Sequence, residues 1–375
     1  MRTGCLASAV ALAGWQPTAR AEDNDVIFNL EPSEKHPRNS EGSFVALKSG
    51  RILFFYTQFH DGTSDASPAH IVRIHSDDGG RTWSQQPVVV VENGTAANVM
   101  SVSLLRLQSG AIALFYLVKN NLLDCRPVMR VSQDEAETWS EARPMGETPG
   151  YFVLNNDRVI QLKSGRLVAP VAFHPAPAAD SRSQHPRDAG ALALWYLSDN
   201  EGKNWREAQT RRTLPARTHT GLQEPGVVEL IDGRLFSWMR TDQGAQFGCY
   251  STDGGQNWPL SERTTLQSPI SPASIKRLPG SADLLAIFND HSGRFAFARS
   301  VRTPLVAAIS SDGGKSWPRR RLIEKAPNGC YCYTAIHFTD DAVLLAYCAG
   351  DPKVGGLNRL RLRRMSLQWL KADAP

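Results

Sequence analysis

One eight-residue pattern returns five times along the chain and constrains the fold more than any other feature. Its consensus is Ser-x-Asp-x-Gly-x-x-Trp, and successive copies start 53–66 residues apart. Ala136 replaces the Gly in the second copy, and Asn200 replaces the Asp in the third. The copies are Ser76–Trp83, Ser132–Trp139, Ser198–Trp205, Ser251–Trp258 and Ser310–Trp317. A repeat of this length indicates a series of similar supersecondary units rather than one continuous layered fold.

A second repeat runs in phase with the first. Pairs of apolar runs, each pair joined by a short turn that usually contains Gly, end at Tyr56, Tyr116, Val171, Met239, Phe288 and Tyr347. Such pairs are typical of β-hairpins. Six hairpins against five signatures indicate a sixth unit that lacks the signature.

Each unit contains enough apolar segments for four strands. The hairpin supplies two, an alternating segment such as His70–Ser76 supplies the third, and a run such as Pro87–Val91 supplies the fourth. The signature lies between the third and fourth as a tight turn, because Asp can cap the turn backbone and Gly tolerates positive φ. We therefore predict an all-β fold, a six-bladed β-propeller of four-stranded antiparallel blades, with the signature Trp residues buried.

The amino terminus has the features of an export signal. Arg2 precedes an apolar stretch that is too short to cross a bilayer, and an Ala-x-Ala site ends at Ala21. We predict a secretory signal peptide at residues 1–21, a single propeller domain at residues 22–375, and a secreted or periplasmic protein. The sequence offers no other membrane-spanning candidate, so we expect no membrane insertion.

Charge and cysteine content narrow the expected partners. The net charge of +5 is dispersed, and the basic segment 360–364 alternates Leu with Arg, as in a strand with a solvated basic face. We expect no nucleic-acid partner and a monomer. Cys330, Cys332 and Cys348 are close enough in sequence for one disulfide, although buried free thiols are the simpler interpretation. No Cys or His grouping has metal-ligand spacing, so we expect no metal and no cofactor.

Strand direction brings polar residues from distant units to one rim. The starts of the first strands and the loops between second and third strands share the rim opposite the signatures. The polar residues there are Arg38, Glu41, Asp61, Asp65, Asn155, Asn156, Asp157, Gln223, Glu224, Arg240, Arg302, Tyr331 and Tyr333. Taken singly, most would be solvated, paired or core residues. Glu224 is different, because it precedes an apolar strand where a charge is costly to bury without a partner. The mouth of a propeller is a natural ligand site.

With these residues the chain resembles the sialidase (neuraminidase) superfamily, in which the signature is known as the Asp box. The segment Gly221–Trp258 is similar to the family segment that supplies a Glu, an Arg at the end of the next strand, and then an Asp box. The similarity extends from about Asp25 over nearly the whole chain. Asp boxes alone indicate the fold, because they also occur in non-catalytic propellers.

The resemblance implies a retaining exo-α-sialidase that removes terminal sialic acid from glycoconjugates. It assigns Asp65 as the acid/base, Tyr333 as the nucleophile and Glu224 as the carboxylate that activates it. Arg38, Arg240 and Arg302 would hold the substrate carboxylate. The remaining candidate substrate contacts are Glu41, Asn156, Asp157 and Tyr331. Sialidases use a Tyr because a carboxylate nucleophile would be repelled by the acidic sugar.

The sequence also departs from the family pattern. The Arg-Ile-Pro motif around the first Arg is not intact, the extra Arg expected after Tyr56 is absent, and Tyr331 competes with Tyr333 for the nucleophile position. Two alternatives therefore stay open. One is an exo-glycosidase acting on another nonulosonic or uronic acid, and the other is a non-catalytic propeller that binds glycans or proteins.

Overall fold

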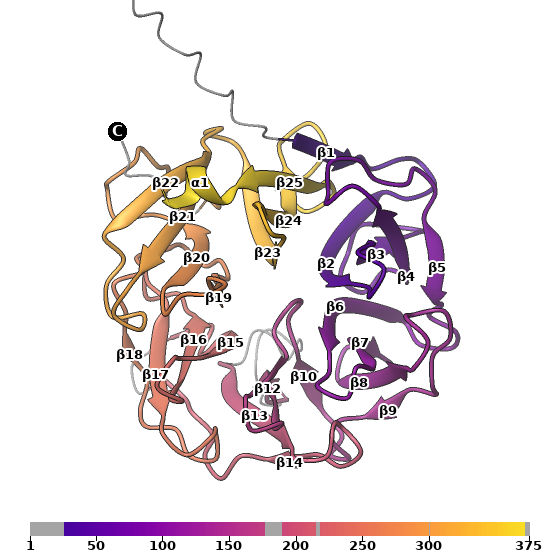
Figure 1. Cartoon of the computed structure of the whole chain (residues 1–375), viewed down its shortest axis with the longest axis horizontal. Coiled ribbons are helices and arrows are strands. Elements are labelled where there is room, and N and C mark those ends of the chain that lie inside the picture. Colours follow the sequence, from indigo (N-terminus) through magenta and orange to yellow (C-terminus); the bar gives the residue numbers. More distant parts are fainter. Residues whose placement is uncertain (1–25, 177–189, 215–217, 300, 372–375) are drawn as a thin grey trace, which may run out of the picture.

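The computed structural model describes residues 26–176, 190–214, 218–299 and 301–371. The predicted signal peptide, residues 1–21, lies outside them. The described chain forms twisted sheets arranged in a ring around a central opening (Figure 1). The all-β class is confirmed, because these residues contain strands β1 to β25 and a single short helix, α1 (Leu367–Lys371).

Four of the sheets are four-stranded antiparallel blades. The first contains β2 (Arg38–Ala46), β3 (Ile52–Phe59), β4 (Ala69–Ser76) and β5 (Val88–Val91). The second contains β15 (Gln223–Glu229), β16 (Leu235–Arg240), β17 (Phe247–Ser251) and β18 (Glu262–Arg263). The third contains β19 (Ser274–Arg277), β20 (Leu284–Asn289), β21 (Leu305–Ser310) and β22 (Arg319–Glu324). The fourth joins β23 (Cys330–Phe338), β24 (Ala342–Gly350) and β25 (Leu360–Ser366) to β1 (Val26–Leu30).

The other nine strands, which come from the second and third sequence repeats, form one continuous sheet. They are β6 (Asn98–Arg106), β7 (Ile112–Lys119), β8 (Cys125–Ser132), β9 (Arg143–Pro144), β10 (Tyr151–Val153), β11 (Ile160–Gln161), β12 (Leu167–His174), β13 (Leu192–Ser198) and β14 (Arg206–Glu207). The prediction of six separate four-stranded blades is therefore wrong. The described residues contain four such blades and this nine-stranded sheet.

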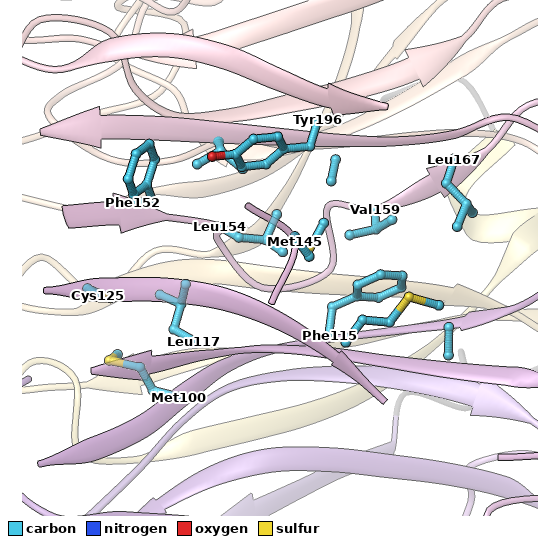
Figure 2. Packing of buried hydrophobic residues seen from close by; sticks show 14 of the residues in the cluster. Met100, Phe115, Leu117, Cys125, Met145, Phe152, Leu154, Val159, Leu167 and Tyr196 are labelled. Atoms are coloured by element: carbon cyan, nitrogen blue, oxygen red, sulfur yellow. The ribbon is translucent and has the colours of Figure 1, made fainter. Parts of the chain in front are cut away.

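A short parallel contact causes the two repeats to merge. Tyr151 of β10 pairs in parallel with Cys125 of β8, and the Cys125 N–H donates to the Gly150 carbonyl at 3.0 Å. One hydrophobic core spans both repeats, with Leu117 on one side and Leu154 and Tyr196 on the other (Figure 2). The two repeats are thus joined by a parallel contact and a common hydrophobic core, where separate antiparallel blades were expected.

The Asp-box turns have the same hydrogen bonds in all five copies. In the first, the Ser76 hydroxyl accepts from the Gly80 N–H at 2.8 Å and donates to the Asp78 carboxylate at 2.8 Å. The fifth position has positive φ in every copy, including +68° at Ala136, where Gly is missing. Trp83, Trp258 and Trp317 are buried as predicted. Trp139 and Trp205, in the two degenerate copies, are only partly buried.

The ring is closed by strands from both ends of the described chain. β1 pairs antiparallel with β25 along its whole length and supplies the outer strand of the last blade. This explains the missing sixth signature, because no turn is needed to lead β25 into a fourth strand. The expectation of a solvated basic face on β25 also changes. Arg361 donates to the Glu324 carboxylate of the neighbouring blade at 2.6 Å, and Arg363 lies 3.6 Å from it.

We expect Glu324→Gln to weaken this contact between blades. Glu324 also accepts from the Tyr347 hydroxyl at 2.7 Å, so its replacement removes an anionic partner of Arg361 and of a buried Tyr. The free energy of unfolding should fall by about 2 kcal/mol, as for a shielded charged hydrogen-bond partner. Urea denaturation measures this change. The exposed Glu262→Gln is the matched control, and equal effects of the two substitutions would contradict the role assigned to Glu324.

Candidate active site

A β-bulge is repeated at the same place in four of the strands that line the central opening. In β2, β6, β15 and β23 the register shifts by one extra residue, after Ser40, Met100, Gln223 and Cys332. The inserted residues are Glu41, Ser101, Glu224 and Tyr333, and their φ angles are +51°, +61°, +46° and +57°. A bulge re-aims a side chain and ends regular pairing. Here it turns polar side chains from distant repeats toward one another.

Glu224 and Tyr333, which belong to different blades, form a hydrogen-bonded pair. The Tyr333 hydroxyl donates to Glu224 Oε1 at 3.0 Å. Arg240 Nη1 donates to both Glu224 oxygens at 2.8 Å and lies 3.5 Å from the Tyr333 hydroxyl. Burial and the neighbouring Glu224 charge raise the pKa of Tyr333 well above its ordinary value. The phenol therefore keeps its proton at neutral pH and shares it with a carboxylate.

A second polar group lies across the cavity at Asp65. Arg38 Nη1 donates to Asp65 Oδ1 at 2.6 Å, and Arg38 Nη2 lies 3.4 Å from Glu41 Oε1. The Ser101 hydroxyl donates to the other Glu41 oxygen. Arg38 is only 2% exposed and lies against the Phe59 ring, behind these two carboxylates. It therefore orients Asp65 rather than lining the cavity.

Arg302 approaches the same place from the loop before β21. Its Nε donates to the Ile270 carbonyl at 3.3 Å, and its guanidinium carbon lies 5.4 Å from the centre of the Tyr333 ring. Arg302 thus lies near the Tyr333 ring, and Arg240 near its hydroxyl. Both line the cavity.

These groups surround a cavity of about 610 Å³ at the mouth of the ring. Its polar and charged lining residues are Glu41, Asp65, Ser101, Lys119, Asn155, His174, Thr220, Gln223, Glu224, Arg240, Arg302 and Tyr333. Its less polar wall is formed by Met100, Leu117, Tyr151, Val153, Ile270 and Leu357. The volume suits one sugar ring with substituents.

Besides Arg38, three predicted contact residues do not line this cavity. Asn156 donates to the Gly42 and Tyr333 carbonyls at 2.9 and 3.1 Å, so it supports the Tyr333 backbone. Asp157 accepts from Ser43, Lys276 and the Ile336 N–H, which ties neighbouring strands together. Tyr331 packs edge-on against Tyr347 in the core. Of the two competing tyrosines, the structure brings Tyr333 to Glu224.

Sequence reasoning missed Ser101 and Lys119. Ser101 stands nine residues before the turn Gly110, the same spacing as Glu41 before Gly50 and Glu224 before Gly233, so the repeat itself could have revealed it. The Lys119 ammonium donates to the Asp65 carbonyl at 2.6 Å and adds a third cation to the cavity wall. Lys119 lies on β7, where it pairs with Asn98 of β6. Only this pairing in the folded protein brings Lys119 beside Asp65.

Among the described residues, no group of three or more His, Cys, Asp or Glu side chains could hold a metal ion. No helix in the same part of the chain is long and apolar enough to cross a membrane. The arrangement can bind an anion at Arg240 and Arg302, present a Tyr hydroxyl to a carboxylate base, and offer a separate carboxyl group at Asp65.

Comparisons with known proteins identify the family of the chain. The family model described as "BNR repeat-like domain" matches residues 85–345, more than half of the chain. A sialidase from Micromonospora viridifaciens is 25% identical over 402 residues, covering 97% of this chain and 56% of that protein. The chain therefore spans little more than half the length of this relative.

The fold is also similar to that of solved structures. An intramolecular trans-sialidase from Ruminococcus gnavus has a TM-score of 0.72 and 16% identity, with 95% of this chain and 100% of that chain covered. A protein of unknown function from Dyadobacter fermentans has a TM-score of 0.71 and 18% identity, with 92% and 98% covered. At these identities the likeness shows the fold alone.

The buried Glu41 should make stability depend on pH in a defined direction. Burial raises the pKa of Glu41 from 4.5 to about 7, although Arg38 opposes the shift. Between these two values the unfolded chain has released a proton that the folded protein retains, so this group lowers stability as pH rises. Glu41→Gln removes the effect. Its free energy of unfolding relative to wild type should rise by about 2–3 kcal/mol between pH 4.5 and 7.

Urea denaturation of both proteins across this pH range tests the prediction. Glu147→Gln, at an exposed position, is the control and should follow the wild-type profile. Parallel profiles for Glu41→Gln and wild type would show that Glu41 ionises normally in the folded protein.

Proposed function

Because the chain belongs to the BNR repeat-like family of sialidase-superfamily β-propellers, we propose that it is a retaining exo-α-sialidase that removes terminal sialic acid from glycans. The observation that carries the proposal is the 3.0 Å hydrogen bond from the Tyr333 hydroxyl to Glu224, in a cavity that also holds Arg240 and Arg302. A neutral nucleophile paired with a base suits a substrate whose reacting carbon bears a carboxylate.

The arginines would bind that carboxylate. Guanidinium groups match carboxylates in fork geometry, and two of them line the cavity beside Tyr333. Arg240 donates to Glu224 through Nη1, so it can orient the base and contact an anion through its other amino group. Arg38, which resemblance assigns to the same role, is engaged with Asp65 and Glu41 in this arrangement.

Tyr333 and Glu224 would form and break the covalent intermediate. The raised pKa of Tyr333 makes a free phenolate unfavourable, so proton transfer to Glu224 would accompany attack on the anomeric carbon. Asp65 would protonate the leaving oxygen and then activate the water that releases the sugar. Two displacements at one carbon preserve its configuration, so the product should be the α-anomer first.

The alternatives differ in what they require of the cavity. A glycan-binding propeller needs cations and polar groups but no base beside a tyrosine, so the Glu224–Tyr333 pair favours an enzyme. Another nonulosonic or uronic acid would use the same carboxylate site, and it is distinguished by the substrate panel below. The names of the relatives, a sialidase and an intramolecular trans-sialidase in complex with oseltamivir carboxylate, support sialic acid as the first sugar to test.

Tyr333→Phe should abolish hydrolysis of fluorogenic glycosides while leaving substrate affinity nearly unchanged, because only the nucleophilic oxygen is lost. A panel with terminal sialic acid, another nonulosonic acid and a uronic acid identifies the sugar that wild type cleaves. Tyr331→Phe is the matched control and should retain activity. Normal rates for Tyr333→Phe would refute the tyrosine mechanism, and no cleavage of any acidic sugar by wild type would refute the enzyme proposal.

Arg302→Ala should weaken binding of the acidic sugar by about 2–3 kcal/mol, the usual cost of truncating one member of a shielded charge pair. The exposed Arg143 of β9, which lies outside the cavity, provides the control Arg143→Ala. Isothermal titration with the product sugar, or a competitive inhibition assay, measures the difference. Equal affinity of Arg302→Ala and Arg143→Ala for the sugar would exclude Arg302 from the carboxylate site.

A further inference from the structure

Arg302 differs from the other two arginines in what holds it. Arg38 pairs with Asp65 and Glu41, and Arg240 pairs with Glu224. Within residues 26–176, 190–214, 218–299 and 301–371, no carboxylate forms a salt bridge with Arg302. Its Nη1 instead donates to the sulfur of Cys332 at 3.0 Å. Its acceptors are therefore the Cys332 sulfur and the Ile270 carbonyl, and neither is a carboxylate.

The sulfur belongs to a row of small polar groups behind the cavity. Cys332 and Cys348 are direct partners in the β23–β24 register, and both are fully buried. The Cys348 sulfur lies 3.3 Å from the Ser40 hydroxyl, which in turn lies 3.4 Å from Arg38 Nη2. All three cysteines of this blade are free thiols. The row of Cys332, Cys348 and Ser40 thus lies between Arg302 and Arg38, and none of its members is a carboxylate.

Cys332 is also coupled by the backbone to the proposed nucleophile. It is the last regularly paired residue before the bulge, and Tyr333 is the residue that the bulge inserts. Arg302 thus contacts the sulfur of one residue and the ring of the next. A displacement of β23 that moves Tyr333 therefore also moves the Cys332 sulfur that Arg302 contacts.

The contacts of Arg302 occupy two of its three guanidinium nitrogens. Here Nη1 donates to Cys332 and Nε donates to the Ile270 carbonyl, whereas Nη2 has no partner in the described part of the chain. Although burial opposes it, hydrogen bonds from Cys330 and Cys348 and the Arg302 charge lower the pKa of Cys332.

We propose that Cys332 is a positioning residue that holds Arg302 with one amino group directed at the substrate carboxylate. This inference rests on the proposed function and adds a specific role to a residue outside the cavity lining. It explains how a cation is kept in place beside the nucleophile without a protein carboxylate that would compete with the acidic sugar.

The test compares ligands that differ only in the carboxylate. The probes are 2-deoxy-2,3-dehydro-N-acetylneuraminic acid and its methyl ester, with inhibition constants measured for wild type, Cys332→Ala and Cys332→Ser. In Cys332→Ala the inhibition constant of the free acid should rise about tenfold, the effect of one lost hydrogen bond to a charged group. The inhibition constant of the ester should change by less than about twofold, and so should the kcat for a fluorogenic sialoside.

Two further variants separate positioning from general stability. Cys332→Ser keeps an acceptor and should regain most of the preference for the acid, whereas Cys249→Ala removes a buried thiol of β17 and should behave as wild type. If Cys332→Ala does not fold, Cys332→Val, which is close to Cys in volume and has no acceptor, takes its place.

Several results would overturn the inference. One is an equal weakening of acid and ester binding in Cys332→Ala, and another is an unchanged preference for the acid in that variant. A third is a loss of preference in Cys332→Ser that is as large as the loss in Cys332→Ala. If wild type itself binds the acid no better than the ester, the proposed sialidase function fails as well. A wild-type preference that survives in every folded variant overturns only the role of Cys332.

Discussion

The site depends on one backbone device, a β-bulge whose first residue has a left-handed conformation. Four strands around the central opening contain it, and none of the four inserted residues is Gly. Left-handed φ costs a non-Gly residue on the order of 1 kcal/mol or more, so the surrounding sheet must enforce it. The result is that Glu224 and Tyr333 leave their strands toward each other, as do Glu41 and Ser101.

The three arginines of the site have different partners. Arg38 lies against Asp65 and Glu41, and Arg240 against Glu224, while Arg302 donates to the Cys332 sulfur. Glu41 is protonated over much of the acidic range, because burial raises its pKa to about 7. Below that pH Glu41 contributes little negative charge to the cavity wall that Arg302 also lines.

The ring that supports these bulges is held together in two different ways. The last blade borrows β1 from the amino-terminal part of the described chain, and Glu324 ties its neighbour to Arg361. The second and third repeats are instead fused through the Tyr151–Cys125 contact and a common core. Because β10 is only three residues long, the segment that follows it is free to carry Asn155 into the cavity and Asn156 beneath Tyr333.

The sequence by itself determined the local units. The signature turns follow from Ser, Asp and Gly at set spacings, and each hairpin follows from its Gly turn, so the all-β class, the propeller and the rim that carries the polar residues could be predicted. Only the tertiary structure decided how strands pair between repeats. A single parallel bridge at Tyr151 merged two of the predicted blades, and no local pattern encodes such a contact. The same holds within the site. Asn156, Asp157 and Tyr331 belong to segments that reach the rim, as the sequence predicts. A one-residue change in register nevertheless decides whether a side chain faces the cavity or the core. Lys119 meets Asp65 and Arg302 meets Cys332 across neighbouring repeats, whereas Glu224 meets Tyr333 only because repeats far apart in sequence close into a ring, and a distance across that ring is a property of the whole fold.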